Sequence, residues 1–358
     1  MSMNASGDRV KTTAREWRRG RIVRFFSVTC TLLLALGAVA PARAEAIEVR
    51  ALSLAFNPEA PLKSGDGLLD YRGGLELRAD AKAFGGFSAA RISADGTRLI
   101  ALSDAGSWFS ATLDYDAKGR LVGLHEARLA PMARPPGKGR FDPEGLVLDP
   151  DGAWLVSTER THRLLRYAAG PAGHDPFARD ADALARLEPI ALPVPTDFAG
   201  LESNAGIESL LRLTDGRLLA IEEGREDAGE AISRAWAIGP DGATASLGLK
   251  RSANFRPTDA ALLPDGDVLV LERRYTKVGG VAARLRLIEA ETIRPGALLD
   301  GAVIATLIPP VTVDNMEALA VYERDGETRL LMMSDDNFNP GQQRTLLLQF
   351  GLTPAARK

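Results

Sequence analysis

The chain has 358 residues, of which 47 are acidic and 44 are basic, so its formal net charge is −3. This balance argues against the basic surface that nucleic-acid binding needs. The chain has one cysteine and three histidines, which excludes a disulfide framework and a zinc site of clustered histidine and cysteine ligands.

The first 44 residues have the composition of an export signal. Arginines precede the apolar run FFSVTCTLLLALGAVA, and the sequence Ala42-Arg43-Ala44 that follows has the small residues of a signal peptidase site. We therefore predict a cleaved signal peptide over residues 1–44 and a periplasmic or secreted protein with no stable membrane anchor. An uncleaved anchor is the alternative, although the run is short for a membrane-spanning helix.

A hairpin motif recurs five times after this segment. Each copy has two apolar runs joined by an Asp-Gly pair, which tolerates the positive φ angles of tight hairpin turns. The pairs are Asp95-Gly96, Asp151-Gly152, Asp215-Gly216, Asp265-Gly266 and Asp325-Gly326. Their spacings of 56, 64, 50 and 60 residues are typical of propeller blades. The sequence therefore predicts an all-β fold, a β-propeller of four-stranded antiparallel blades with five repeats counted, over residues 45–358.

The two ends of this region decide how the ring closes. After the fifth repeat the sequence predicts one further strand, at residues 344–350, and a lone strand at residues 73–80 precedes the first repeat. We expect the N-terminal strand to complete the C-terminal blade, because this pairing removes free sheet edges. A sixth, degenerate blade built from residues 47–80 and the C-terminal tail is the alternative.

Two segments do not fit the hairpin pattern. Residues 132–140 read MARPPGKGR, and residues 170–198 are rich in proline, alanine and charged side chains. We predict that both are surface insertions, the second with a helical turn in ARDADALARL.

Carboxylates gather at the start of the first strand and at the end of the second strand of the repeats. In a propeller these positions form the mouth of the central channel, and hairpin pairing places each start opposite its matching end. The starts carry Asp142, Glu144, Glu208, Asp259 and Glu317, and the ends carry Asp104, Glu159, Glu222, Glu223, Glu272, Asp335 and Asp336. So many carboxylates at one end of the channel need countercharge.

Calcium is one predicted countercharge, because Ca²⁺ takes about six to eight oxygen ligands from carboxylates, amide carbonyls and water. The predicted metal ligands are Asp142, Glu144, Glu208, Glu222, Asp259, Glu317 and Asp335, with further oxygens from Asn204, Asn315 and Asn337.

Arginine is the other predicted countercharge, because its guanidinium group binds carboxylate or phosphate through two hydrogen bonds. The arginines beside these acids are Arg160, Arg225, Arg256, Arg273 and Arg274. We predict catalytic roles for Glu159, Arg160, Glu272 and Arg273, at a site where metal and arginine together stabilise developing charge. The alternative is that the acid–arginine pairs only hold neighbouring blades together.

The five hairpin phrases together resemble one family. They are GGFSA near the start, DPEGLVLDPDG with STER, NAGIESLLRLTDGRLLAIEE, RPTDAALLPDG, and NMEALAV with SDDNF. They are similar to the bacterial, exported "esterase-like activity of phytase" family, a phytase-like β-propeller group, over nearly all of residues 45–358. The resemblance implies an exported propeller that hydrolyses esters, among them phosphate esters.

Three functions remain open on the sequence. The first is a metal-dependent hydrolase of phosphate or carboxylic esters, and the second is a non-catalytic periplasmic binding propeller. The third is a lactonase-type propeller in which one metal polarises a ring ester. The chain has no G-x-S-x-G motif and no phosphate-binding P-loop. We expect a monomer with a small-molecule ester or phosphate ligand and no nucleic-acid partner. Without the first 44 residues, which hold eight basic and two acidic side chains, the net charge is near −9.

Overall fold

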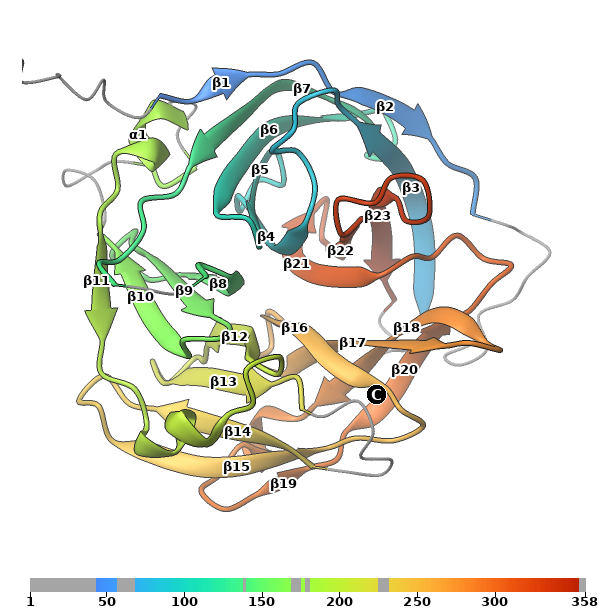
Figure 1. Ribbon diagram of the computed structural model, residues 1–358. Coiled ribbons are helices and arrows are strands. Elements are labelled where there is room, and N and C mark those ends of the chain that lie inside the picture. The colour runs from blue at the N-terminus through green and yellow to red at the C-terminus, as the bar shows by residue number, and fades with distance from the viewer. Residues whose placement is uncertain are drawn as a thin grey trace, which may run out of the picture. The chain divides into compact units, whose positions relative to one another are not determined.

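The computed structural model describes residues 43–56, 68–137, 140–168, 175–177, 181–224 and 232–353. The predicted signal peptide falls almost entirely outside these ranges. In the described residues the strands form five sheets, each built around one of the five hairpins. Figure 1 shows these sheets arranged as blades around a ring, with the first strand of each hairpin on the inside. The five-bladed propeller is therefore confirmed.

Blade 1 contains β4, β5, β6 and β7, with the short strand β1 on its outer edge. The bounds are β4 (Phe87–Ile92), β5 (Arg98–Ser103), β6 (Ser107–Tyr115), β7 (Leu121–Pro131) and β1 (Glu45–Ala46). Blade 2 contains β8 (Pro143–Leu148), β9 (Trp154–Thr158), β10 (Arg163–Tyr167) and β11 (Pro189–Leu192).

The prediction that residues 170–198 are only a surface insertion is wrong in one part. The segment includes the helix α1 (Ala181–Ala185), as expected, but also β11, which pairs with β10 as the fourth strand of blade 2. A short 3₁₀ helix, η1 (Thr196–Gly200), follows β11. The proline, alanine and charge content concealed this strand because its outer position leaves much of it exposed.

Blade 3 contains β12 (Ile207–Arg212), β13 (Leu218–Glu222), β14 (Ile232–Ile238) and β15 (Thr244–Lys250). Blade 4 contains β16 (Arg256–Leu262), β17 (Val268–Thr276), β18 (Gly280–Ile288) and β20 (Ala302–Leu307). The chain between β18 and β20 forms the 3₁₀ helix η2 (Ala290–Thr292) and the strand β19 (Leu298–Leu299). β19 pairs in parallel with β15 and so ties blade 4 to the outer edge of blade 3.

Blade 5 is built from both ends of the propeller. It contains β21 (Met316–Arg324), β22 (Glu327–Ser334), β23 (Thr345–Leu352), β3 (Leu69–Arg78) and β2 (Arg50–Ser53). β3 pairs antiparallel with β23 as the predicted fourth strand, and β2 adds a fifth. The closure prediction is confirmed, and β2 and β3, the strands within residues 47–80 that were the alternative sixth blade, both belong to blade 5.

The Asp-Gly turns and the core behave as the sequence predicts. All five turn glycines have positive φ angles, between 71° and 95°. The inner strands are nearly continuous in buried apolar residues because a neighbouring blade covers each face. Aromatic side chains fill the space between blades 1 and 2, where Trp108 packs against Trp154 and Tyr167.

Within the described ranges, no helix is long and apolar enough to span a membrane.

One irregularity recurs in every blade and positions the channel mouth. The pairing of the first two strands slips near the start of the inner strand, where an additional residue forms a β-bulge. The residues at this point are Ser88, Glu144, Glu208, Thr258 and Glu317. A bulge bends the strand and redirects a side chain. Three of the five blades therefore present a glutamate at the equivalent place.

Candidate active site at the channel mouth

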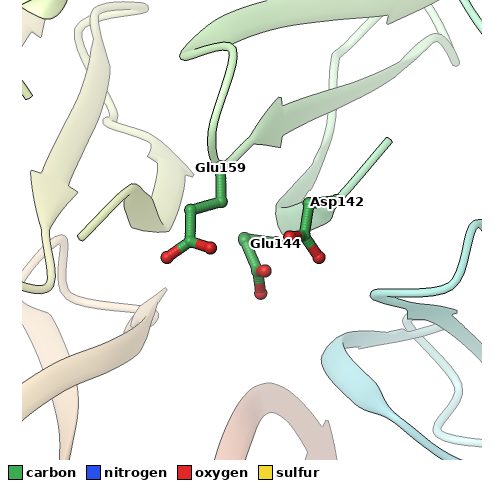
Figure 2. A group of neighbouring side chains, drawn as sticks. All are labelled: Asp142, Glu144 and Glu159. Atoms are coloured by element: carbon green, nitrogen blue, oxygen red, sulfur yellow. The ribbon is translucent and has the colours of Figure 1, made fainter. Parts of the chain in front are cut away.

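Three carboxylates of blade 2 form the centre of the candidate site. Asp142 immediately precedes β8, Glu144 lies at its bulge, and Glu159 immediately follows β9. The amide of Glu159 donates to the carbonyl of Asp142 at 2.8 Å, which holds the two strand ends together. One carboxylate oxygen from each residue lies within 4.8 Å of the others. Figure 2 shows the three side chains side by side.

The electrostatic environment of Glu144 and Glu159 opposes their ionisation. Burial of the Glu144 carboxyl raises its pKa well above its ordinary value, and the negative charges of Glu208 and Glu159 add to the rise. A hydrogen bond with Ser88 acts in the opposite direction. Burial, followed by the charge of Asp142, raises the pKa of Glu159 to about 7. The group therefore attracts positive charge or protons.

Two arginines supply part of that charge at one side of blade 2. Arg160 forms an ion pair with Asp142, and its Nη2 lies 3.9 Å from Glu159. The Nε of Arg140 lies 3.5 Å from Asp142, and this side chain is more than half exposed. Arg160 has a positive φ of 56°, so the turn after β9 directs its guanidinium back toward Asp142. No ion pair is seen for Glu144 among the described residues.

A second group of charges comes from blades 3, 4 and 5. Arg273 of blade 4 pairs with Glu223 at 3.0 Å and with Glu317 at 2.6 Å. Arg256 pairs with the other oxygen of Glu223 at 2.9 Å. Burial raises the pKa of Glu317 to about 7, although Arg273 opposes the rise. Burial and the charge of Glu223 raise the pKa of Glu208 well above its ordinary value.

The remaining acids lie at the ends of the second strands of blades 1 and 5. Burial raises the pKa of Asp335 well above its ordinary value, and the charges of Glu317 and Asp104 contribute. Burial, with the charge of Asp142, also raises the pKa of Asp104. We call the connected set the acid cluster. It consists of Asp104, Asp142, Glu144, Glu159, Glu208, Glu223, Glu317, Asp335 and Asp336.

Two glutamates predicted at the mouth point elsewhere. Glu222 pairs with Arg234 of its own blade at 2.7 Å, and its neighbour Glu223 faces the cluster instead. Glu272 is fully buried and pairs with Arg284 and Arg286 of the adjacent strand β18. The structure therefore does not pair Glu222 and Glu272 with the acid cluster, because successive residues of a strand face opposite sides and the sequence alone did not fix which side faces the channel.

Asp259 is also misplaced by the sequence prediction. Glu144, Glu208 and Thr258 each lie seven residues before the Asp of their own Asp-Gly turn. Asp259 lies only six residues before its turn. Its carboxylate binds Arg91 at 2.8 Å and accepts the amide of Leu319 at 2.8 Å. The sequence contains this spacing, and applying it to blade 4 would have predicted Thr258 as the residue at the bulge.

Arg91 closes the channel beneath the acid cluster. Its guanidinium spans from blade 1 to Asp259 of blade 4 and also donates to the carbonyl groups of Leu210 and Leu319. Blades 1 and 4 are not neighbours, so this side chain crosses the channel.

Of the asparagines predicted as further oxygen donors, only Asn315 contacts an acid of the cluster directly in a hydrogen bond between side chains of the described residues. Asn204 accepts a hydrogen bond from Arg160 at 3.2 Å, and Asn315 donates to Glu317 at 2.8 Å. Asn337 donates to Gln343 at 3.1 Å. Arg274 lies over the ring of Phe255, with its guanidinium carbon 4.7 Å from the centroid. Arg225 falls outside the described residues.

Solved structures with a similar overall fold are distant in sequence. A streptogramin B lyase is 10% identical with a TM-score of 0.38, and the match covers 87% of this chain and 89% of that chain. A protein of unknown function from Dyadobacter fermentans is 12% identical with a TM-score of 0.42, over 87% and 97% of the two chains. An α-L-arabinanase of Cellvibrio cellulosa is 11% identical with a TM-score of 0.41, over 74% and 92%.

Comparison with curated proteins finds no match. The sequence profile described as "Phytase-like: Esterase-like activity of phytase" matches residues 82–338, which is more than half of the chain. The matched span begins after β3 and ends before β23, so it contains all five hairpins and the whole acid cluster. The chain therefore belongs to the phytase-like family described as "Esterase-like activity of phytase".

Proposed function

We propose that the protein is an exported hydrolase of phosphate or carboxylic esters that works with a divalent cation, Ca²⁺, at the channel mouth. The observation that supports this most directly is the convergence of Asp142, Glu144 and Glu159, whose carboxylate oxygens lie within 4.8 Å of one another. The family assignment supports an enzyme with the same class of substrate.

The donor set fits Ca²⁺. Oxygens on opposite sides of a calcium ion lie about 4.6–5.2 Å apart, because each bond is about 2.3–2.6 Å long. The three carboxylate oxygens lie within 4.8 Å of one another, which is close enough for all three to reach one ion, and every donor is an oxygen. Glu144 has no ion pair among the described residues, so a cation would offset the burial and the repulsion that together raise its pKa. When bound there, Ca²⁺ would polarise the ester oxygen and stabilise its developing negative charge.

The rest of the cluster offers groups for binding and proton transfer. Glu317 has a pKa of about 7 and so exchanges a proton near neutral pH, as a general acid or base must. Arg273 holds Glu317 and Glu223 in place through two ion pairs. Arg140 is more than half exposed beside Asp142, where it can bind an anionic part of the substrate.

Activity should depend on the cation and on the blade 2 acids. The exported protein is assayed with phytate, with simple aryl esters and with sugar lactones, before and after chelation and after return of Ca²⁺. The proposal is supported if hydrolysis is lost on chelation and recovers when Ca²⁺ is returned, and if the Glu144→Gln variant is inactive. Asp265→Asn, at a hairpin turn, is the matched control and should retain activity.

The pattern of substrates distinguishes the hydrolase, lactonase-type and binding-propeller hypotheses. If the protein hydrolyses sugar lactones but neither phytate nor aryl esters, the lactonase-type hypothesis is favoured. If the protein binds Ca²⁺ but hydrolyses none of the three substrate classes, the acid cluster belongs to a binding propeller and the hydrolase proposal fails.

A further inference from the structure

A cavity of about 520 Å³ lies beside the acid cluster, between blades 5 and 1. Three segments line it: the end of β3 with the following residues 79–84, the loop that joins β22 to β23, and Arg50 of β2. None of the functions discussed above uses this space, which is large enough for a small organic molecule.

Asp336 connects this cavity to the channel mouth. It lines the cavity, and its neighbour Asp335 is part of the acid cluster. The Oδ1 atom of Asp336 accepts the amides of Gly86 and Phe338 at 3.1 and 3.0 Å. These bonds fix the loop after β22 against the segment that leads into β4. The cavity and the acid cluster therefore share the loop segment that contains Asp335 and Asp336.

Part of the cavity wall is apolar. Leu77 and Phe84 are buried, and Phe338 and Pro340 complete this wall. Phe338 has a φ of 50° and an exposed fraction of 39%, which is unusual for a phenylalanine. Its ring packs on Gly86, where an added Cβ atom would lie 2.3 Å from the ring. The ring is thus held at the edge of the cavity, available to an apolar ligand.

The other part of the wall is cationic, although residues 45–358 carry a net negative charge. Four basic and three acidic residues line the cavity: Arg50, Arg78, Lys82, Arg344, Glu76, Asp80 and Asp336. Arg50 pairs with Asp80 at 3.4 Å, Arg78 pairs with Glu76, and Arg344 lies 3.3 Å from Asp314.

Lys82 differs from the three arginines. It is exposed, and none of the ion pairs among the described residues involves it. Lys82 is therefore the one basic residue of the lining for which the described residues supply no ion pair, and it lines the same cavity as the apolar wall.

We propose that this cavity binds a monoanionic group with an apolar body, such as an aromatic carboxylate, with the anion at Lys82 and the apolar part against Phe338. The cavity would then hold the part of the ester that lies remote from the bond being hydrolysed. Only this last assignment rests on the proposed function. The predicted substrates are esters with an acidic, apolar substituent.

Benzoate, titrated by calorimetry into the full exported protein, tests the binding. The buffer is freed of divalent cations, because without them the acid cluster repels anions. We expect saturable binding of benzoate and none of benzyl alcohol, which has the same body without the charge. Lys82→Gln should weaken benzoate binding about tenfold, the effect of losing one charge-assisted contact. Phe338→Ala should also weaken it.

Lys118→Gln is the matched control, because Lys118 is an exposed lysine in the turn between β6 and β7. It should bind benzoate as the parent does. Absence of benzoate binding to the parent, or equal binding by Lys82→Gln, overturns the proposal. Equal binding of benzyl alcohol shows that the cavity does not select an anion, which also overturns it. These results are independent of Ca²⁺ and hydrolysis, so the proposed function can fail while benzoate binding is confirmed, and the reverse.

Discussion

Arg91 and Asp259 form an ion pair with two contacts, at 2.8 and 3.0 Å, across the channel between two blades that are not neighbours. Asp259 is fully buried, and the Arg91 side chain is 13% exposed. A buried carboxylate needs such a partner because burial of an unpaired charge is costly. This pair therefore contributes both to the closure of the channel and to the association of the blades.

Replacing Arg91 with methionine should lower the free energy of unfolding by about 3–5 kcal/mol, because Asp259 loses its countercharge in a buried position. The double variant Arg91→Met with Asp259→Asn should recover part of the loss. Urea denaturation measures both. A cost no greater than that of Lys118→Met, at an exposed site, would show that the pair does not hold the propeller together.

Calcium should stabilise the protein through the acid cluster. A ligand that binds only the folded state adds about 2.7 kcal/mol at a hundredfold excess over its Kd. We expect Ca²⁺ to raise the melting temperature, and Glu144→Ala or Glu208→Ala to reduce that rise. Asp265→Asn should leave the response intact. A melting temperature indifferent to Ca²⁺ and to chelator in all four proteins would contradict a cation site.

The buried Glu317 should make the metal-free protein less stable as the pH rises. Its pKa increases from 4.5 to about 7 on folding, so between these values the folded state binds more protons than the unfolded state. Stability is then full below pH 4.5 and falls by up to about 3 kcal/mol as the pH passes through 7. Denaturation from pH 5 to 8 should show this slope, and Glu317→Gln should reduce it. An unchanged slope in that variant would assign the effect to other groups.

Gln349 should be important for the closure of the ring. This fully buried side chain of β23 accepts the amide of Leu121 at 2.8 Å and donates to the hydroxyl of Tyr322 at 2.7 Å. It thus connects blade 5 with blade 1. Gln349→Leu should cost about 2–4 kcal/mol, because the amide of Leu121, the carbonyl of Gly119 and the hydroxyl of Tyr322 all lose this partner. Gln342→Leu, at an exposed position in the preceding loop, should cost little in the same denaturation measurement.

The exported protein should begin at Glu45. This residue starts β1, which pairs with β7 at the outer edge of blade 1. Cleavage after Ala44 would leave that pairing intact, since no residue of β1 is removed. Mass spectrometry of the protein recovered from the periplasm or medium checks the expected N-terminus. Recovery of an intact leader would favour the anchored alternative.

The sequence determined the propeller and its closure. Five Asp-Gly turns at similar spacing predict five hairpins, because these residues adopt the required backbone angles whatever surrounds them. The lone strand at residues 73–80 predicts the fourth strand of the last blade because a ring removes free edges. Both inferences depend on local backbone chemistry and on chain order, which the sequence states directly.

The tertiary structure decided which acids share the channel mouth. Glu222 and Glu223 are adjacent glutamates that the sequence does not distinguish, yet only Glu223 forms ion pairs with Arg256 and Arg273. The pleat of the strands and the bulge in each blade select the side that faces the channel, and one residue of register reverses it. The ion pair of Arg91 was not predicted for a related reason. Its partner Asp259 lies 168 residues away in the sequence and becomes a neighbour only when the ring closes.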